Sequence, residues 1–158
     1  MILARRGMMR VMRPLVLALL VLLSGAPAPT QPGEGGALLR VRVTDARGKQ
    51  GQMIFGVFDQ PKGFPSEEKR SVNWQTKRAD AGELVFECRL PPGKYAASVL
   101  HDENGNGQMD MNLIGIPKEG YGVTNNPKPK RRAARFDEAL FDLPPQGAEL
   151  TISLQYFQ

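Results

Sequence analysis

The stretch ELVFECRLPPGKYAASVLH, residues 83–101, contains two runs in which apolar and polar side chains alternate. The side chains on the apolar face of the first run are Leu84, Phe86, Cys88 and Leu90. Alternation with a period of two is typical of a strand that buries one face. Pro92 and Gly93 separate the two runs and predict a type II turn, because proline presets one dihedral angle and glycine accepts a positive φ at the next position.

The same alternation recurs on both sides of this stretch, at residues 38–45 and 149–156. Residues 53–58 are nearly all apolar, and residues 72–79 could form an outer strand. No long window has the period of a helix. Short strands separated by glycine and proline predict an all-β fold, an antiparallel sandwich of about seven strands with one long Gly/Pro-rich crossover loop. Residues 135–143 fit either a helical turn or a strand, and the sequence leaves both open.

The N-terminus predicts export. Four arginines precede an uncharged apolar run at residues 15–23, and small residues follow it. This order indicates a cleaved signal peptide over residues 1–28, since the run is shorter than the roughly 20 residues of a membrane span. We expect a flexible leader at 29–37, a β-sandwich domain at 38–158, no transmembrane anchor after processing, and a periplasmic or secreted location.

Charge and cysteine content narrow the function classes. The chain has 21 basic and 16 acidic residues, and removal of the four N-terminal arginines leaves 17 against 16, a net charge of +1. Nucleic acid is therefore not an expected partner. Cys88 is the only cysteine, so no internal disulfide is available, and its place on the apolar face predicts a core residue.

The segment HDENGNGQMD, residues 101–110, places several oxygen-bearing side chains within nine residues. Counted from Asp102, these residues match positions 1, 3, 5, 7 and 9 of a calcium-binding loop, with Gly107 at position 6. The candidate ligands are Asp102, Asn104, Asn106, Gln108 and Asp110. Position 12 is Leu113, where the motif requires glutamate, so the site predicts weak calcium binding. A purely structural turn explains the same residues, and both interpretations stay open.

A family resemblance rests on residues 101–107, Asp110, residues 115–122 and the segment RFDEALFDL at 135–143. With these motifs the chain resembles the secreted bacterial family called domain of unknown function 2141 (DUF2141). The resemblance implies an exported single-domain protein with no assigned activity, similar to transthyretin-like and carboxypeptidase-regulatory-like β-sandwiches. The chain departs from the family pattern at PKPKRRAAR, residues 127–135, where members usually have glycine and proline.

Two further segments are candidate binding sites. The crossover at residues 115–127 contains Lys118, Glu119 and Tyr121, which could line a sugar- or peptide-binding cleft beside the ion. The basic run at 128–135 could meet an anionic surface, but a solvated charged loop is the favoured interpretation, because no aromatic residues are interleaved with the charges.

The sequence predicts a non-enzymatic binding or accessory module with no catalytic residues. Its expected partner is an unknown protein, peptide or glycan of the cell envelope, and calcium is its one candidate cofactor. Two alternatives remain: a small periplasmic hydrolase that uses Asp102 or Asp110 with His101, and an envelope-associated protein held by the basic run at 128–135.

Overall fold

The computed structural model describes residues 35–80, 84–128 and 132–157. Within these segments the chain forms strands joined by loops, with two short helices, η1 (Glu68–Arg70) and α1 (Phe136–Ala139). The strands are β1 (Ala37–Thr44), β2 (Gln52–Phe58), β3 (Asn73–Arg78), β4 (Val85–Leu90), β5 (Gly93–Asp102), β6 (Gly120–Val123), β7 (Leu140–Leu143) and β8 (Ala148–Ser153).

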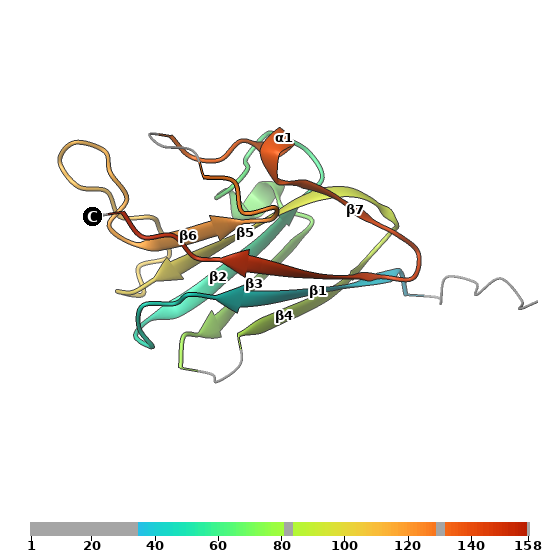
Figure 1. Ribbon diagram of the computed structural model, residues 1–158, viewed down its shortest axis with the longest axis horizontal. Coiled ribbons are helices and arrows are strands. Elements are labelled where there is room, and N and C mark those ends of the chain that lie inside the picture. Colours follow the sequence, from blue (N-terminus) through green and yellow to red (C-terminus); the bar gives the residue numbers. More distant parts are fainter. Residues whose placement is uncertain (1–34, 81–83, 129–131, 158) are drawn as a thin grey trace, which may run out of the picture.

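The strands make two sheets that face each other, so the predicted all-β sandwich is confirmed (Figure 1). One sheet has the order β4-β1-β8, and the other has the order β3-β2-β5-β6, with β7 also paired to β5. Strand β5 is long enough to serve two partners on one edge. Its first residues pair with β7 and its last residues pair with β6.

The core lies between the two sheets and follows the alternation in the sequence. Leu39, Val41 and Val43 of β1 point inward, as do alternate side chains of β2, β4 and β5. The stacked rings of Phe55 and Phe86, 4.8 Å apart between centroids, join the two sheets. Full burial of each large apolar side chain stabilises the fold by about 1.5–3 kcal/mol.

Cys88 lies in this core as predicted, and burial raises the pKa of its thiol to about 11.

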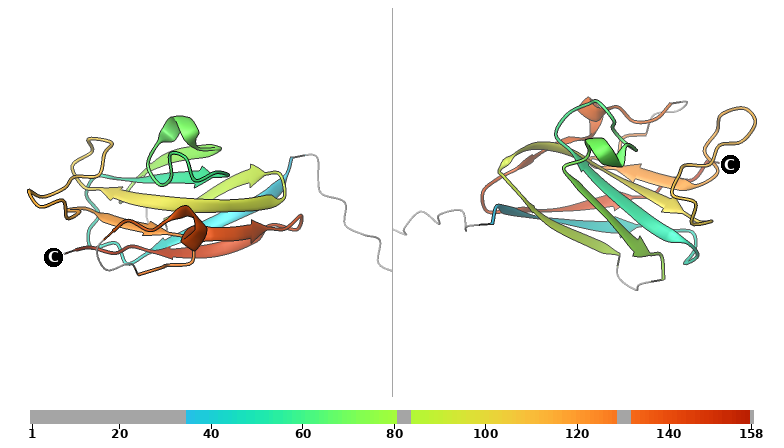
Figure 2. Two further views of the ribbon diagram at one scale, coloured as in Figure 1. Left: turned by 90° about the horizontal axis from the view of Figure 1, so that it is seen from above. Right: turned by 180° about the vertical axis from the view of Figure 1, so that it is seen from behind.

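A second apolar cluster covers part of the outer face of the five-stranded sheet. Ala96 of β5 and Val123 of β6 pack there against Ala139 of α1, with Phe64 and Phe136 at the rim. Phe58 of β2 packs edge-on against Phe64 at this rim, 5.5 Å apart between ring centroids, which accounts for one apolar side chain on the outer face of β2. The cluster includes Ala139 of α1, and α1 covers only part of this face of the sheet (Figure 2).

Three local predictions need correction. Gly93 is not among the residues with positive φ, so Pro92 and Gly93 do not form the predicted type II turn. The strands on either side of them, β4 and β5, belong to different sheets. The two prolines instead carry the chain from one sheet to the other. The pairing of β1 with β8 is parallel, whereas the other strand pairs of the described segments are antiparallel. The predicted crossover at 115–127 also contains a strand, β6.

The segment at 135–143 satisfies both of the alternatives that its sequence leaves open. Arg135 caps α1, which ends at Ala139, and β7 begins at Leu140. A single turn of helix buries Ala139 against β5, and the strand that follows buries Phe141 and Leu143 in the core.

At the N-terminal side, β1 begins at Ala37, which is buried, one residue before the predicted start of the domain. The predicted signal peptide, 1–28, lies outside the described residues, as does most of the predicted leader. Within the described residues, the helices are all too short and too polar to span a membrane.

Candidate functional site

The acidic loop, residues 102–110, projects from the end of the sandwich where β5 ends (Figure 1). Asp102, the last residue of β5, has no exposed surface. Its Oδ1 accepts hydrogen bonds from the backbone N–H groups of Gly105 (2.8 Å) and Asn106 (3.1 Å). Its Oδ2 accepts from the N–H of Gly107 (2.7 Å) and from the side-chain amide of Gln52 (2.7 Å). This carboxylate therefore holds the turn together from inside.

Glu119 holds the same loop from outside its sequence. It is buried, and its Oε1 accepts from the N–H of Glu103 (2.9 Å) while its Oε2 accepts from the N–H of Asp110 (3.1 Å). One carboxylate thus clasps the acidic loop at its second and last residues. The predicted binding residue Glu119 is a structural residue in this geometry, with no surface left for a partner.

The two asparagines bond to Asp110. The side-chain amides of Asn104 and Asn106 donate to Oδ2 (2.7 Å) and Oδ1 (3.1 Å) of Asp110, while their Oδ1 atoms accept the N–H groups of Asn106 and Gln108. The partly positive amide hydrogens contact the carboxylate oxygens at the place where a cation would bind. An ion at this position would have to displace both amides from Asp110.

The structure brings the predicted calcium ligands together, but as a hydrogen-bonded turn. Among the residues described, no group of three or more His, Cys, Asp or Glu side chains is arranged to hold a metal ion. The acceptor oxygens of Asp102 are already bonded, and Asp110 has two amide partners. Calcium binding therefore stays a proposal.

His101 is buried beside the loop, and both of its ring nitrogens have partners. Nε2 donates to the carbonyl of Gln50 (2.9 Å), and Nδ1 lies 2.7 Å from the hydroxyl of Tyr156. Since a carbonyl only accepts, the neutral ring has its hydrogen on Nε2, and Nδ1 accepts from Tyr156. Burial raises the pKa of Tyr156. His101 thus ties the C-terminal segment to the β1–β2 loop, and no face of it is open to a substrate.

An ion pair covers this arrangement. The guanidinium of Arg47 donates to both carboxylate oxygens of Glu103 (2.7 and 2.6 Å) and to the carbonyl of Lys118 (2.9 Å), and it lies 4.6 Å above the ring of Tyr156. These hydrogen bonds lower the pKa of Glu103. Lys118 contributes its backbone here, and its side chain is exposed.

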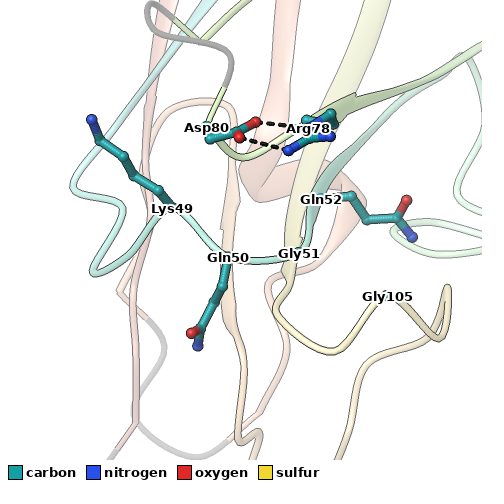
Figure 3. A pocket seen from close by; sticks show the side chains of 7 residues that line it. All are labelled: Lys49, Gln50, Gly51, Gln52, Arg78, Asp80 and Gly105. Carbon is teal, nitrogen blue, oxygen red and sulfur yellow. Dashed lines mark hydrogen bonds and ion pairs between the residues drawn. The ribbon is translucent and has the colours of Figure 1, made fainter.

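A polar depression of about 370 Å³ lies next to the acidic loop (Figure 3). Gln50, Gly51 and Gln52 form one side, and Gly105 forms another. Two of its three charged residues, Arg78 and Asp80, pair with each other through hydrogen bonds of 2.9 and 2.7 Å. The third, Lys49, is a single lysine at an open surface, which does not define a binding site, so we do not assign a site to this depression.

A larger groove, of about 860 Å³ and lined mostly by apolar side chains, crosses the outer face of the five-stranded sheet. Its floor contains a row of directly paired residues on three strands, Ile54 on β2, Leu100 on β5 and Tyr121 on β6. Trp74 of β3 lies over Gly56, because an added Cβ at that glycine would come within 2.7 Å of the indole. Gly56 therefore gives the indole its place in the floor.

The walls of the groove come from segments far apart in the sequence. One wall is formed by the end of the acidic loop and the residues after it, through Met109, Met111, Ile114 and Ile116. Pro65 and Arg132 contribute at other points, and the ring of Phe157 stacks on Tyr121 at 5.6 Å between centroids. The buried carboxylates of Asp102 and Glu119 hold the acidic loop in place, and the loop positions one wall of the groove.

Of the predicted binding residues, Tyr121 alone lines this groove. Sequence analysis missed Trp74, Ile54 and Leu100. The available signal was the run at 53–58, whose apolar residues on both faces require a cover on each side.

The basic run at 128–135 is only partly described, since residues 129–131 lie outside the described segments. Arg132 and Arg135 do not form a free cationic surface. Arg132 donates to both oxygens of Glu138 (2.8 and 2.6 Å), and Arg135 lies 3.3 Å from Asp137. Glu138 consequently has a pKa of about 2.

Comparison with family models gives one match. The model described as "Uncharacterized protein conserved in bacteria (DUF2141)" matches residues 41–152, from within β1 to within β8. The chain belongs to this family. DUF2141 membership, predicted from the loop and crossover motifs, is thereby confirmed. No curated protein and no solved structure matches the chain significantly.

Proposed function

We propose that this DUF2141 protein is a non-enzymatic binding module that takes an apolar segment of a partner protein or peptide in the groove over the five-stranded sheet. The observation that carries the proposal is the groove itself: about 860 Å³, floored by Ile54, Leu100, Trp74 and Tyr121. Concave, mostly apolar sites with a few polar groups at the rim are the usual form of binding sites in proteins.

The chemistry of the lining favours an apolar peptide over a glycan. Sugar recognition needs several polar groups that converge on hydroxyls, whereas Ser98 already donates to the carbonyl of Pro65 (2.7 Å) and Arg132 is paired with Glu138. The flat rings of Trp74 and Tyr121 offer large contact area to apolar side chains.

Catalysis by the residues of the hydrolase alternative finds no support in the geometry. His101 and Asp102 are buried. Hydrogen bonds within the protein occupy both ring nitrogens of His101 and both carboxylate oxygens of Asp102, so neither residue reaches a substrate. We accordingly retain the non-enzymatic assignment as part of the proposal.

Export to the periplasm or beyond is part of the same proposal, supported by the N-terminal sequence at residues 1–28. We also propose that the fold is akin to the transthyretin-like and carboxypeptidase-regulatory-like sandwiches, supported by the small two-sheet architecture. Calcium would act only as an additional brace for the acidic loop.

The single tryptophan of the chain tests the groove, because Trp74 lies in its floor. The protein is titrated with a leucine- and valine-rich decapeptide flanked by lysines, and in parallel with cellotriose. We expect the peptide to shift the Trp74 emission saturably, and the sugar to leave it unchanged.

Two variants locate the response. Tyr121→Ser removes an aromatic ring from the floor of the groove. It should weaken the peptide response by about tenfold, since each lost aromatic contact is worth ~1–3 kcal/mol. Leu38→Ser is the matched control, because Leu38 is an exposed apolar residue of β1 outside the groove. A peptide response of equal strength in all three proteins would refute the assignment.

A further inference from the structure

The loop that forms one wall of the groove has a second, outward-facing surface. We call residues 111–117 the apolar tip. Leu113 is fully exposed, Ile114 is 79 % exposed and Met111 is 51 % exposed. Among the described residues, the other exposed large apolar side chains, Leu38 and Val72, are isolated and only 36 % and 40 % exposed. The apolar tip is thus the one place in the described chain where large apolar side chains cluster in water.

The tip is a built turn. The Oδ1 of Asn112 accepts the N–H groups of Ile114 (3.0 Å) and Ile116 (2.9 Å), and the N–H of Asn112 donates to the carbonyl of Ile116 (2.8 Å). Gly115 has φ +77°, and Met111 pairs with Pro117 as an isolated bridge. Internal hydrogen bonds therefore hold the turn in shape, with Leu113 in water and Ile114 largely exposed at the border of the groove. Their exposure does not come from a lack of local structure.

Charges around the tip are arranged for an anionic surface. Residues 111–117 contain no charged side chain, and the next residue, Lys118, is exposed and cationic. The two carboxylates that flank the tip are directed elsewhere: Asp110 bonds to the amides of Asn104 and Asn106, and Glu119 is buried. No free acidic group adjoins the tip within residues 110–119.

We propose that the apolar tip inserts Leu113 and Ile114 into the interfacial region of an anionic lipid bilayer, with Lys118 at the headgroups. Each such side chain buries roughly 60–120 Å² of apolar area. Three of them fall well short of the ~800 Å² per partner that a stable protein–protein interface needs. A bilayer accepts a small convex tip without a matching shape, and its attraction grows with the buried apolar area and with cationic neighbours. The proposal does not depend on what the groove binds.

A fluorophore at the tip tests insertion directly. Leu113→Cys is labelled with nitrobenzoxadiazole in the full chain, and the label is followed on addition of phosphatidylcholine vesicles with and without phosphatidylglycerol. Cys88 does not compete, because it is buried and its thiol has a pKa of about 11. The control label is at Leu38→Cys, on β1, which begins at the end of the molecule opposite the tip (Figure 1). Binding through any other part of the chain leaves the tip label in water.

Insertion gives a blue shift at the Leu113 label, larger with phosphatidylglycerol, and none at the Leu38 label. Co-sedimentation of unlabelled proteins should show a partition coefficient about 100-fold lower for Leu113→Ser/Ile114→Ser than for the control Leu38→Ser/Val72→Ser, about tenfold for each tip residue. Lys118→Glu should weaken binding to the anionic vesicles only.

No blue shift at the tip label with either vesicle, or equal sedimentation of the two double variants, overturns the proposal. A blue shift that requires an added protein and not vesicles also overturns it, in favour of a protein surface. The Trp74 response to the decapeptide is measured in Leu113→Ser alone, because Ile114 also lines the groove and Leu113 does not. This variant reports on the groove separately, so failure of one proposal is distinguishable from failure of the other.

Discussion

The acidic loop at 102–110 and the apolar tip at 111–117 are neighbours in the chain and opposites in their use of side chains. In the acidic loop, polar side chains point inward and bond to backbone amides, with Asp102 completely buried. In the apolar tip, Asn112 makes the inward bonds, the apolar side chain of Leu113 lies in solvent, and Ile114 is largely exposed at the border of the groove.

This contrast reverses the ordinary expectation that polar residues of a loop meet partners and apolar residues hold it together. Buried carboxylates are tolerated only when hydrogen bonds replace water, and here backbone N–H groups do so. The residues that resemble a metal site are therefore the scaffold, whereas the residues that carry no motif are the ones free to bind.

Substitution at the scaffold should have the largest effect on stability. Asp102→Asn replaces one carboxylate oxygen, which accepts hydrogen bonds, with an NH2 group, which donates them. The N–H donors that face this group lose their acceptor in a buried site, so part of a cluster of four hydrogen bonds is lost. We expect the free energy of unfolding to fall by about 2–4 kcal/mol. Urea denaturation measures it. Asp142→Asn, which removes a surface ion pair with Lys94, is the control and should change stability by less than ~1 kcal/mol.

The second test compares the clasp with the tip. Glu119→Gln keeps one acceptor and turns a donor toward the N–H of Glu103 or Asp110, so we expect a loss of about 1–3 kcal/mol. Leu113→Ser, six residues away, should leave the unfolding midpoint unchanged, because its side chain buries nothing. Equal losses in the two variants would contradict the division between scaffold and binding surface.

Calcium titration tests whether the hydrogen bonds of the acidic loop exclude an ion. Isothermal titration of the native protein should give a dissociation constant no tighter than about 10⁻⁴–10⁻³ M, the range of weak extracellular sites. In Asn104→Asp/Asn106→Asp, the two amides that donate hydrogen bonds to Asp110 become carboxylates. We expect this variant to bind calcium at least about tenfold more tightly and to be less stable than the native protein without calcium, because three carboxylates then repel each other.

Tight binding by the native loop would show that Asn104 and Asn106 rotate away from Asp110 without difficulty. Failure of the double variant to bind would show that Asp102 has no lone pair left for an ion.

The sequence predicts the sandwich well because its strands alternate strictly, as at Leu39, Val41 and Val43, and alternation is a local property. Local pattern does not reveal which sheet a strand joins. Pro92 and Gly93 therefore predicted a type II turn, whereas the chain there crosses from one sheet to the other, and the parallel β1–β8 pair was missed for the same reason.

The candidate site was predicted less well. Spacing places the oxygens of Asp102 and Asp110 in one bend, but it does not show whether N–H groups or an ion satisfy them, because those donors come from the backbone. The groove depends on Gly56 leaving room for Trp74 on the neighbouring strand, a cross-strand relation that no sequence window contains.

The smallest predicted effect concerns a surface carboxylate beside the groove. Arg132 and the N–H of Arg135 lower the pKa of Glu138 from 4.5 to about 2, chiefly through hydrogen bonds. A carboxyl whose pKa is lower in the folded state stabilises the fold above its unfolded pKa, and this stabilisation is lost as the pH falls through the folded value. The difference in unfolding midpoint between the native protein and Glu138→Gln should thus be constant above pH ~5 and shrink between about 4.5 and 2.

The side chain of Glu138 is in contact with solvent, so the difference will be small, and a second variant decides its cause. The same comparison, with and without Glu138→Gln, is repeated in an Arg132→Gln background. There the pH dependence of the difference should largely vanish, because the main hydrogen-bond donor is gone. If the dependence persists, the N–H of Arg135 at the start of α1 holds the carboxylate by itself. The Arg132 side chain at the edge of the groove could then move without destabilising α1. The shape of the groove would therefore change more easily than the hydrogen-bonded turn at Asp102.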